Sequence, residues 1–467
     1  MSPTRREFLN AVALGAGAMA VSCRTTRHAA RQRKPNIIYI LADDLGYGDL
    51  GCYGQKKVKT PNLDRLAAEG MRFTDHYSGS TVCAPSRNCL MTGEHTGHAW
   101  LRGNQRHPLR KEDVTVAELL KRAGYATGCV GKWGLGMNGT TGAPNRQGFD
   151  LFFGFVNQSR AHFYYPPHVW RNEEKVSLEG NDVKRQSGQY VHDLFTGEAL
   201  EFVRDNRTGP FFLYLPYTIP HAELTVPEDS MAPYNGKFPE KRWPKDHYGG
   251  QDTPHAAFAG MVSRLDRDVG RIMELLREMG LDENTIVMFS SDNGPHKEGG
   301  ADPDFFESNG PLVGIKRDLY EGGVRVPMIA RWPRRISPGS VTNHVSAFWD
   351  VLPTCAELAG LAAPEGIDGI SFVPTLRGRS RQRRHNYLYW EFYEQGGKQA
   401  VRRGDWKAVR LNVRRDPENP LELYNLARDI GETTNVADEY PDIVAEIAAI
   451  MNTAHTESEH YKLTTTG

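Results

Sequence analysis

The sequence has no excess charge of either sign, because its 467 residues include 57 basic and 57 acidic side chains. A balanced charge argues against a nucleic-acid-binding scaffold and against a polybasic membrane binder. Past residue 30 no apolar run is long enough to cross a bilayer, and there is no internal repeat or low-complexity segment. The basic run at 379–384 is interpreted as a solvated loop. What these absences leave is a globular chain, long enough for one large domain and a smaller one.

Cysteine is scarce, with six residues, and the cysteine spacing is not that of a metal site. Cys23 lies in the N-terminal leader, and Cys83 lies in a motif described below. A chain of this length does not depend on disulfides for its core, so most of the others are expected to be free and buried. These four are Cys52, Cys89, Cys129 and Cys355.

Residues 1–33 have the features of an export signal and leader. The segment 4–9 looks like a twin-arginine signal, and the apolar stretch at 11–21 is too short for a stable membrane span. Two processing routes stay open. Residues 18–20 fit an ordinary signal-peptidase site, whereas 20–23 resemble a lipoprotein box with alanine where leucine is usual. We therefore expect a periplasmic or cell-surface protein, tethered to the membrane through lipidated Cys23 in the second case.

Short apolar runs rich in β-branched residues alternate with helical patterns along the chain. Helices are expected after Thr60, which can cap a first turn at Pro61, and over 116–122 and 258–279. This alternation predicts an α/β fold with a large, mostly parallel mixed sheet flanked by helices. The expected strands are 36–41, 126–130, 211–216, 285–289 and 326–330.

After about residue 376 the pattern changes. The segments 386–392, 400–410 and 422–426 alternate like hairpin strands, and a helical pattern follows at 443–451. We therefore expect a catalytic domain at 34–376 and a smaller C-terminal subdomain of antiparallel sheet plus helix at 377–467.

Polar residues follow the ends of several expected strands. Open α/β sheets bind ligands beyond the carboxyl ends of their strands, so loops that converge there predict a single active site. The residues are Asp43 and Asp44, Lys132, His221, and Asp292 with Asn293.

The stretch Cys83-Ala84-Pro85-Ser86-Arg87 is the most informative in the chain. A cysteine two residues before a proline and four before an arginine is the pattern that formylglycine-generating enzymes oxidise to an aldehyde. The hydrated aldehyde is a gem-diol, one hydroxyl of which can attack the sulfur of a sulfate ester. The other hydroxyl then loses its proton and expels sulfate as the aldehyde reforms. A serine would be left as a stable sulfate ester.

Four further motifs occur in the expected order, and from about Pro35 to about Tyr440 the chain resembles the type I, formylglycine-dependent sulfatases of the alkaline-phosphatase-like superfamily. The resemblance implies hydrolysis of an organic sulfate ester, a carbohydrate sulfate rather than an aryl sulfate, and a formylglycine-generating enzyme as maturation partner. Two alternatives stay open. One is a phosphoesterase of the same superfamily, which usually carries a Ser or Thr nucleophile and zinc-binding histidines. The other is a non-catalytic, sulfoglycan-binding surface lipoprotein.

A metal site is expected at two of the strand ends. Two adjacent carboxylates, Asp43 and Asp44, are costly to hold together without a cation. Together with Asp292 and Asn293 they offer oxygen ligands only, which favours a hard cation. The resemblance implies Ca²⁺, with the modified Cys83 completing its ligands.

The resemblance also assigns the reacting groups. Arg87 would contact the gem-diol and the metal carboxylates, while Lys132 and Lys316, each in a glycine-rich motif, would hold the sulfate. His221, in Ile219-Pro220-His221, would protonate the leaving alcohol, a role that suits histidine because its pKa lies near working pH.

One position departs from the commonest family pattern. The residue two after the lysine is often a histidine that takes the proton when sulfate is expelled, and here it is Gly134. Glycine there also occurs in a branch of carbohydrate sulfatases, which implies a galactose or N-acetylgalactosamine 4-sulfate as substrate. His162, beside the aromatic run 163–165, is the candidate either to replace the missing base or to bind the sugar. The alternative is a structural loop histidine.

Overall fold

The computed structural model describes residues 34–104 and 107–463, and the described residues from Pro35 onward form one compact unit. The predicted export signal and Cys23 lie outside the described residues. Within the described ranges, no helix combines the length and apolar character that a membrane crossing needs. The cysteines at 52, 83, 89, 129 and 355 are free, and all except the partly buried Cys52 are buried, as the sequence predicts.

A ten-stranded mixed sheet forms the centre of the unit. Its middle strands β9, β1, β8, β4 and β5 run parallel, while β10, β6 and β7 are antiparallel to their neighbours. This confirms the predicted mostly parallel sheet. In spatial order the strands are β11 (Ser340–Thr342), β2 (Met71–Phe73), β10 (Met328–Arg331), β9 (Thr285–Ser291), β1 (Asn36–Ala42), β8 (Phe211–Pro216), β4 (Ala126–Lys132), β5 (Leu151–Phe155), β6 (His168–Arg171) and β7 (Glu174–Ser177).

Helices cover both faces of this sheet. The longer ones are α2 (Pro61–Ala68), α3 (Cys83–Thr92), α4 (Val116–Arg122), α5 (Val191–Asp205), α7 (Pro254–Glu278) and α10 (Val351–Ala359), whereas α12 (Pro441–Ala454) packs on the smaller sheet described below. Single turns form α6 (Glu228–Met231), α8 (Pro303–Phe306), α9 (Glu321–Val324) and α11 (Val373–Leu376). A two-stranded ladder pairs β3 (His76–Tyr77) with β12 (Ser346–Ala347).

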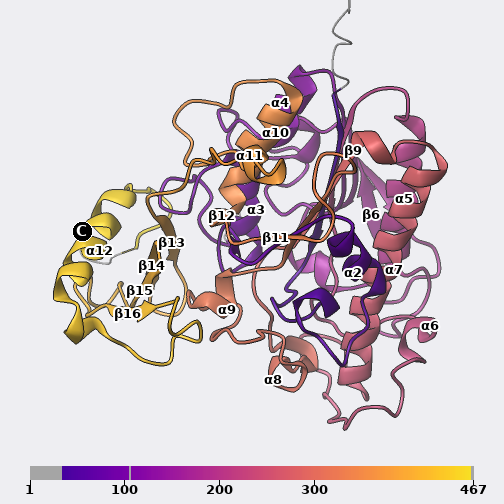
Figure 1. Cartoon of the computed structure of the whole chain (residues 1–467). Coiled ribbons are helices and arrows are strands. Elements are labelled where there is room, and N and C mark those ends of the chain that lie inside the picture. Colours follow the sequence, from indigo (N-terminus) through magenta and orange to yellow (C-terminus); the bar gives the residue numbers. More distant parts are fainter. Residues whose placement is uncertain (1–33, 105–106, 464–467) are drawn as a thin grey trace, which may run out of the picture. The chain divides into compact units, whose positions relative to one another are not determined.

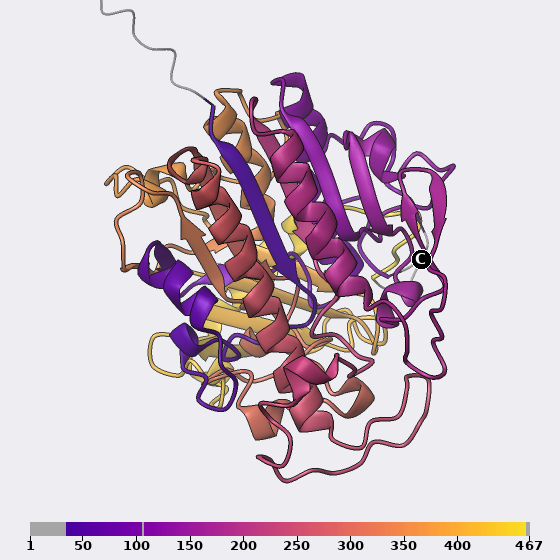
Figure 2. The same cartoon turned by 90° about the vertical axis from the view of Figure 1, so that its right-hand side faces the viewer.

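Alternate residues of β1 point into two different cores, as expected for a strand buried on both faces. Ile38 and Ile40 pack with α2, α5 and α7, and Figure 2 shows α5 and α7 running across that face. Tyr39 and Leu41 pack on the opposite side with α3, α4 and α10. The central strands are therefore rigidly held, and the loops at their carboxyl ends are fixed in position.

A separate four-stranded antiparallel sheet follows, as predicted, with α12 on its outer side (Figure 1). One face, with Trp390, packs against Tyr77 and Trp349 of the larger part, and the other face packs against Ile447 and Met451 of α12. Its strands are β13 (Leu388–Phe392), β14 (Lys398–Arg403), β15 (Trp406–Leu411) and β16 (Glu422–Asn425).

One local prediction is wrong, and two predicted elements are present with shifted bounds. Thr60 does not cap α2, because its hydroxyl accepts a hydrogen bond from Gly51 N at 2.8 Å and donates one to Asp64. The helix expected from 258 starts at Pro254, since proline suits a first helical turn. The strand expected at 326–330 starts two residues later, as β10. Val326 does not join the large sheet because its backbone N–H donates to His76 O at 3.0 Å.

Candidate active site

The predicted site residues meet at one edge of the large sheet, where β9, β1, β8 and β4 are consecutive neighbours. Asp43 and Asp292 directly follow β1 and β9, Lys132 ends β4, and the loop after β8 carries His221. Every predicted site residue except His162 is at most 6 % exposed. The structure thus brings together residues that lie up to 273 positions apart, from Asp43 to Lys316.

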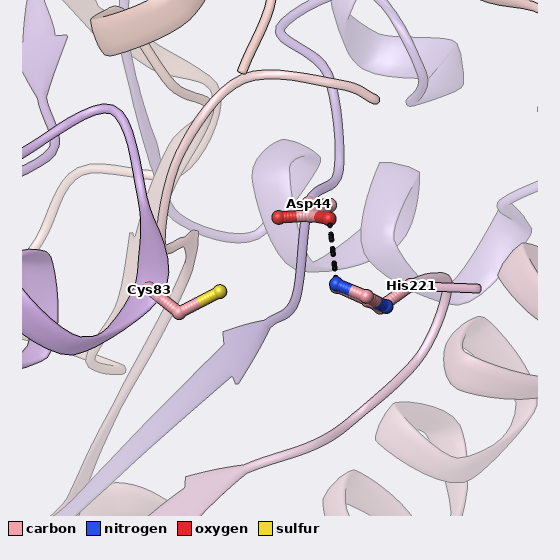
Figure 3. Close-up of side chains that lie close together, drawn as sticks. All are labelled: Asp44, Cys83 and His221. Atoms are coloured by element: carbon pink, nitrogen blue, oxygen red, sulfur yellow. Dashed lines mark ion pairs between the residues drawn. The ribbon is translucent and has the colours of Figure 1, made fainter. Parts of the chain in front are cut away.

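Cys83 is the first residue of α3, a helix that is buried along its whole length. Figure 3 shows its side chain pointing toward Asp44, and its Sγ lies 3.4 Å from Asp43 Oδ1. Burial, and after it the neighbouring Asp43, raise the pKa of the thiol well above its usual range. An unmodified Cys83 is therefore a protonated thiol, which is a poor nucleophile.

The oxygen-rich cluster around Cys83 fits a hard cation. Carboxylate oxygens of Asp43, Asp44 and Asp292 and the Cys83 sulfur all lie within 4.8 Å of one another. Asn293 donates through Nδ2 to Asp44 Oδ1 at 2.7 Å, while its buried Oδ1 has no partner among the described residues. A buried carbonyl oxygen without a donor is costly, and a cation would satisfy it. Donors of this type favour calcium or magnesium over zinc.

Arg87 and Lys132 offset the charges of Asp292 and Asp43, and Lys316, described below, offsets that of Asp44. Arg87 donates through Nη2 to Asp292 Oδ2 at 2.7 Å and through Nη1 to the carbonyl of Lys132 at 2.6 Å. Lys132 Nζ donates to Asp43 Oδ2, also at 2.7 Å. Burial alone would raise the pKa of Asp43, but Lys132 and Arg87 outweigh burial and hold this pKa below its usual range. Burial and the nearby Asp43 charge raise the pKa of Asp292 instead.

His221 and Lys316 form the other side of the cluster. Lys316 Nζ lies 2.7 Å from Asp44 Oδ2 and 2.9 Å from His221 Nε2. His221 Nδ1 lies 2.6 Å from the carbonyl of Ala222, so it carries the proton and Nε2 accepts from Lys316. Burial, then Lys316, lower the pKa of His221 well below its usual range. The ring is therefore neutral, and its 3.3 Å contact with Asp44, dashed in Figure 3, is not an ion pair between full charges.

His162 lies beside His221, as a site residue would. The two rings stack with centroids 4.2 Å apart, and His162 Nδ1 is buried without a partner among the described residues. Burial, then Lys132, lower the pKa of His162 to about 3, so this ring is also neutral. The space next to Gly134 is occupied by another residue: a Cβ on Gly134 would lie 2.2 Å from Gln158 Nε2.

Sequence reasoning missed three residues around His221. Glu298 Oε2 lies 3.5 Å from Lys316 Nζ and accepts from Tyr248 OH at 2.7 Å. His296 stacks on His221 at 5.3 Å. His296 and Glu298 closely follow Asp292-Asn293 in the same loop, which was a signal available in the sequence. Tyr248 lies in a segment with no recognisable motif.

Two known protein families match this chain. The family described as Sulfatase matches residues 35–361, and N-sulphoglucosamine sulphohydrolase, C-terminal, matches 315–458. The chain belongs to the sulfatase family. This confirms the predicted family, and with it the alkaline-phosphatase-like fold and the activity class of a sulfuric ester hydrolase.

Relatives of this sulfatase match over most of their length. Mouse N-acetylgalactosamine-6-sulfatase is 31 % identical, covering 93 % of this chain and 87 % of the relative. The N-acetylgalactosamine-6-O-sulfatase of Bacteroides thetaiotaomicron is also 31 % identical, covering 91 % and 94 %. The solved structure of Ps i-CgsB superimposes with a TM-score of 0.79 at 30 % identity, covering 93 % of this chain and 96 % of that one.

Proposed function

We propose that this sulfatase is an exported, calcium-dependent enzyme that hydrolyses a sulfate monoester of a sugar through a formylglycine formed at Cys83. The observation that carries the proposal is the place of Cys83. It starts a buried helix and lies within 4.8 Å of carboxylate oxygens of Asp43, Asp44 and Asp292, with two lysines at the same cluster. A reactive thiol does not need such surroundings, whereas a metal-assisted sulfate site does.

Asp43, Asp44, Asp292, Asn293 and the modified Cys83 would hold the Ca²⁺. The fit rests on the all-oxygen donors and on the orphaned Asn293 Oδ1. Once bound, the cation would neutralise charge on the sulfate and keep the sulfate beside residue 83.

The chemistry of residue 83 would be that of a hydrated aldehyde. It requires a formylglycine-generating enzyme in the producing cell, which is the one protein partner we propose for maturation. The hydrated side chain supplies both a nucleophilic oxygen and a second hydroxyl that permits release of the sulfate without attack by water at sulfur. Arg87, fixed by Asp292 and the Lys132 carbonyl, supports this group by orienting the carboxylates next to it.

Lys132 and Lys316 would bind the sulfate oxygens, since both ammonium groups are buried and already donate to carboxylates. His221 would give a proton to the leaving alcohol through Nε2. For this step Nε2 must first take up a proton, and Lys316, whose Nζ lies 2.9 Å from that atom, would orient the ring. His162 would either accept the proton on sulfate release or bind the sugar.

The substrate we propose is a sulfated galactose or N-acetylgalactosamine. Gly134 favours the 4-sulfate, while the names of the mouse and Bacteroides relatives specify the 6-sulfate. A structural neighbour was crystallised with k-i-k-neocarrahexaose, which supports an oligosaccharide ligand. The enzyme would act in the periplasm or at the cell surface, with its leader cleaved or lipidated at Cys23.

The decisive experiment combines a substrate panel with mass spectrometry of residue 83. Protein made in a host with the maturation enzyme should carry formylglycine and release sulfate from 4- or 6-sulfated sugars. The Cys83→Ser variant, produced in parallel, should lose turnover because serine cannot eliminate sulfate. Active enzyme with a wholly unmodified Cys83 would overturn the mechanism. A folded protein that binds the sugars but has no hydrolytic activity would favour a binding lipoprotein.

A further inference from the structure

Two adjoining cavities lie beside the active site and are not explained by the chemistry at Cys83. The smaller measures about 100 Å³ and the larger about 250 Å³. They share Met137, Val156 and Asn157 in their walls, so they adjoin, and together they are called the groove below. Since a water molecule takes up about 30 Å³ in the liquid, the groove can hold much more than a few waters.

The inner end of the groove lies near the reaction site. Its lining includes Gly134, two residues after Lys132, and a two-residue separation spans at most about 7 Å. It also includes Asn104, whose Oδ1 accepts from the backbone N–H of Ala84, next to Cys83. Gln158 lines the same end, and its buried Nε2 has no acceptor among the described residues. An unpaired buried donor beside a cavity indicates a ligand acceptor.

The outer end of the groove is cationic. Lys175 is the cross-strand partner of Trp170 in the β6–β7 hairpin, and His168 lies two residues before Trp170 on the same face. Arg160 completes this end, and both Arg160 and Lys175 are exposed. Neither has an acidic partner within 4.0 Å in the part of the chain that the structure describes. Burial, then the positive charges of Lys175 and Arg160, lower the pKa of His168.

We propose that this groove binds the sugar adjacent to the one that loses its sulfate, and that Arg160 and Lys175 bind an anionic group on that second sugar. Trp170 offers an apolar surface for the sugar ring, and the Gln158 amide bonds the sugar nearer to residue 83. The natural substrate is then an oligosaccharide with at least two anionic groups. This inference rests on the proposed function but concerns a different set of residues.

The test compares a disulfated disaccharide with the same disaccharide that carries only the sulfate to be cleaved. Wild-type enzyme should prefer the disulfated form in kcat/KM by about tenfold or more, as expected for hydrogen bonds between charged groups. Arg160→Gln with Lys175→Gln should abolish this preference and leave turnover of the monosulfated form unchanged within about twofold.

The matched control removes the same charge from another cavity. Arg379 and Arg384 are exposed and line a cavity of about 780 Å³ that shares no lining residue with the groove. Arg379→Gln with Arg384→Gln should keep the preference for the disulfated sugar. An equal loss in both double variants would mean general charge attraction and would overturn the proposal. An unchanged preference in the Arg160/Lys175 variant, or no preference in the wild type, would also overturn it.

Binding separates this proposal from the hydrolytic function. Calorimetry with Cys83→Ala protein should show tighter binding of the disulfated disaccharide, and the Arg160/Lys175 substitutions should remove that difference. If no variant hydrolyses either sugar while this binding pattern holds, the proposed function fails and the groove assignment stands. If hydrolysis occurs but the binding of the two sugars does not differ, the groove assignment fails alone.

Discussion

His221 has its two ring nitrogens assigned by their neighbours: Nδ1 donates to the carbonyl of Ala222, and Nε2 faces Lys316 at 2.9 Å. A general acid matters most when the leaving group is a poor one. We therefore expect His221→Ala to lower kcat on a sulfated sugar by roughly 10²–10⁴-fold, and far less on nitrophenyl sulfate, which leaves without a proton. Steady-state kinetics on both substrates test this. Equal losses on the two would contradict the role, and unchanged thermal unfolding would exclude misfolding as the cause.

His162 has a neutral ring stacked on His221 and an unpartnered Nδ1, so it can accept a hydrogen bond or a proton. We expect His162→Ala to slow hydrolysis of a sulfated sugar. A base for sulfate release would leave a covalent sulfo-enzyme that accumulates on every substrate. A sugar-binding role would lower kcat/KM on the sugar alone and keep aryl sulfate turnover.

Exposed His247, whose ring lies 4.9 Å from that of Tyr248, is the matched control for this variant. His247→Ala should behave like the wild type on both substrates. Wild-type kinetics for His162→Ala as well would leave only a structural role for that histidine.

At the scale of elements, a hydrogen bond joins the C-terminal end of α12 to the small sheet. His455 directly follows the helix, and its Nδ1 lies 2.6 Å from Oε1 of the fully buried Glu391 on β13. This hydrogen bond raises the pKa of His455 above its usual value, against an opposing effect of burial and with Arg102 and Glu457 nearby. Since the folded-state pKa exceeds the unfolded one, the protonated pair stabilises the attachment below about pH 6.5. The stabilisation is lost as the pH rises through the folded-state pKa.

Amide protection near residues 449–457, corrected for intrinsic exchange rates, should therefore fall between pH 6 and pH 9. His455→Gln should flatten this dependence, because glutamine keeps a hydrogen bond but does not titrate. Protection that changes equally with pH in the wild type and in His455→Gln would refute the link.

At the scale of the whole molecule, the proposed metal ligands join distant parts of the chain, since Asp44 and Asn293 are 249 residues apart and directly hydrogen-bonded. Removing Ca²⁺ would leave three carboxylates and an unpartnered amide oxygen. We expect chelation to abolish activity and to lower the free energy of unfolding, by about 2.7 kcal/mol if the metal had been present at 100 times its Kd.

Elemental analysis with thermal unfolding, before and after EGTA treatment, would check this. Calcium should restore both activity and stability, and magnesium should serve as the comparison cation with similar ligands. Stoichiometric zinc, with activity recovered only on adding zinc, would refute the calcium assignment.

Much of the fold and of the site could be predicted from local sequence. The runs at 36–41 and 285–289 are strands, and the polar residues that follow them meet at one edge, because parallel strands end on the same side of a sheet. The sequence also predicted that the oxygen-bearing side chains of Asp43-Asp44 and Asp292-Asn293 would gather at this edge, and their role as metal ligands stays a prediction. The domain boundary near residue 376 stays a prediction.

Other features depend on packing between segments with no shared local pattern. The strand β10 runs antiparallel to β9, which the sequence of β10 does not indicate. Gln158 fills the space beside Gly134, which the residues next to Gln158 in the sequence do not indicate either. The cationic groove end combines Arg160, from the short 3-10 helix Ser159–His162, with a hairpin residue, Lys175. Tyr248 reaches His221 from a segment without a motif. The sequence alone determined which residues are the candidates for the chemistry, because residue type and local spacing indicate them. Only the tertiary structure decided what surrounds them, because side-chain contacts across long loops follow from the packing of the whole chain.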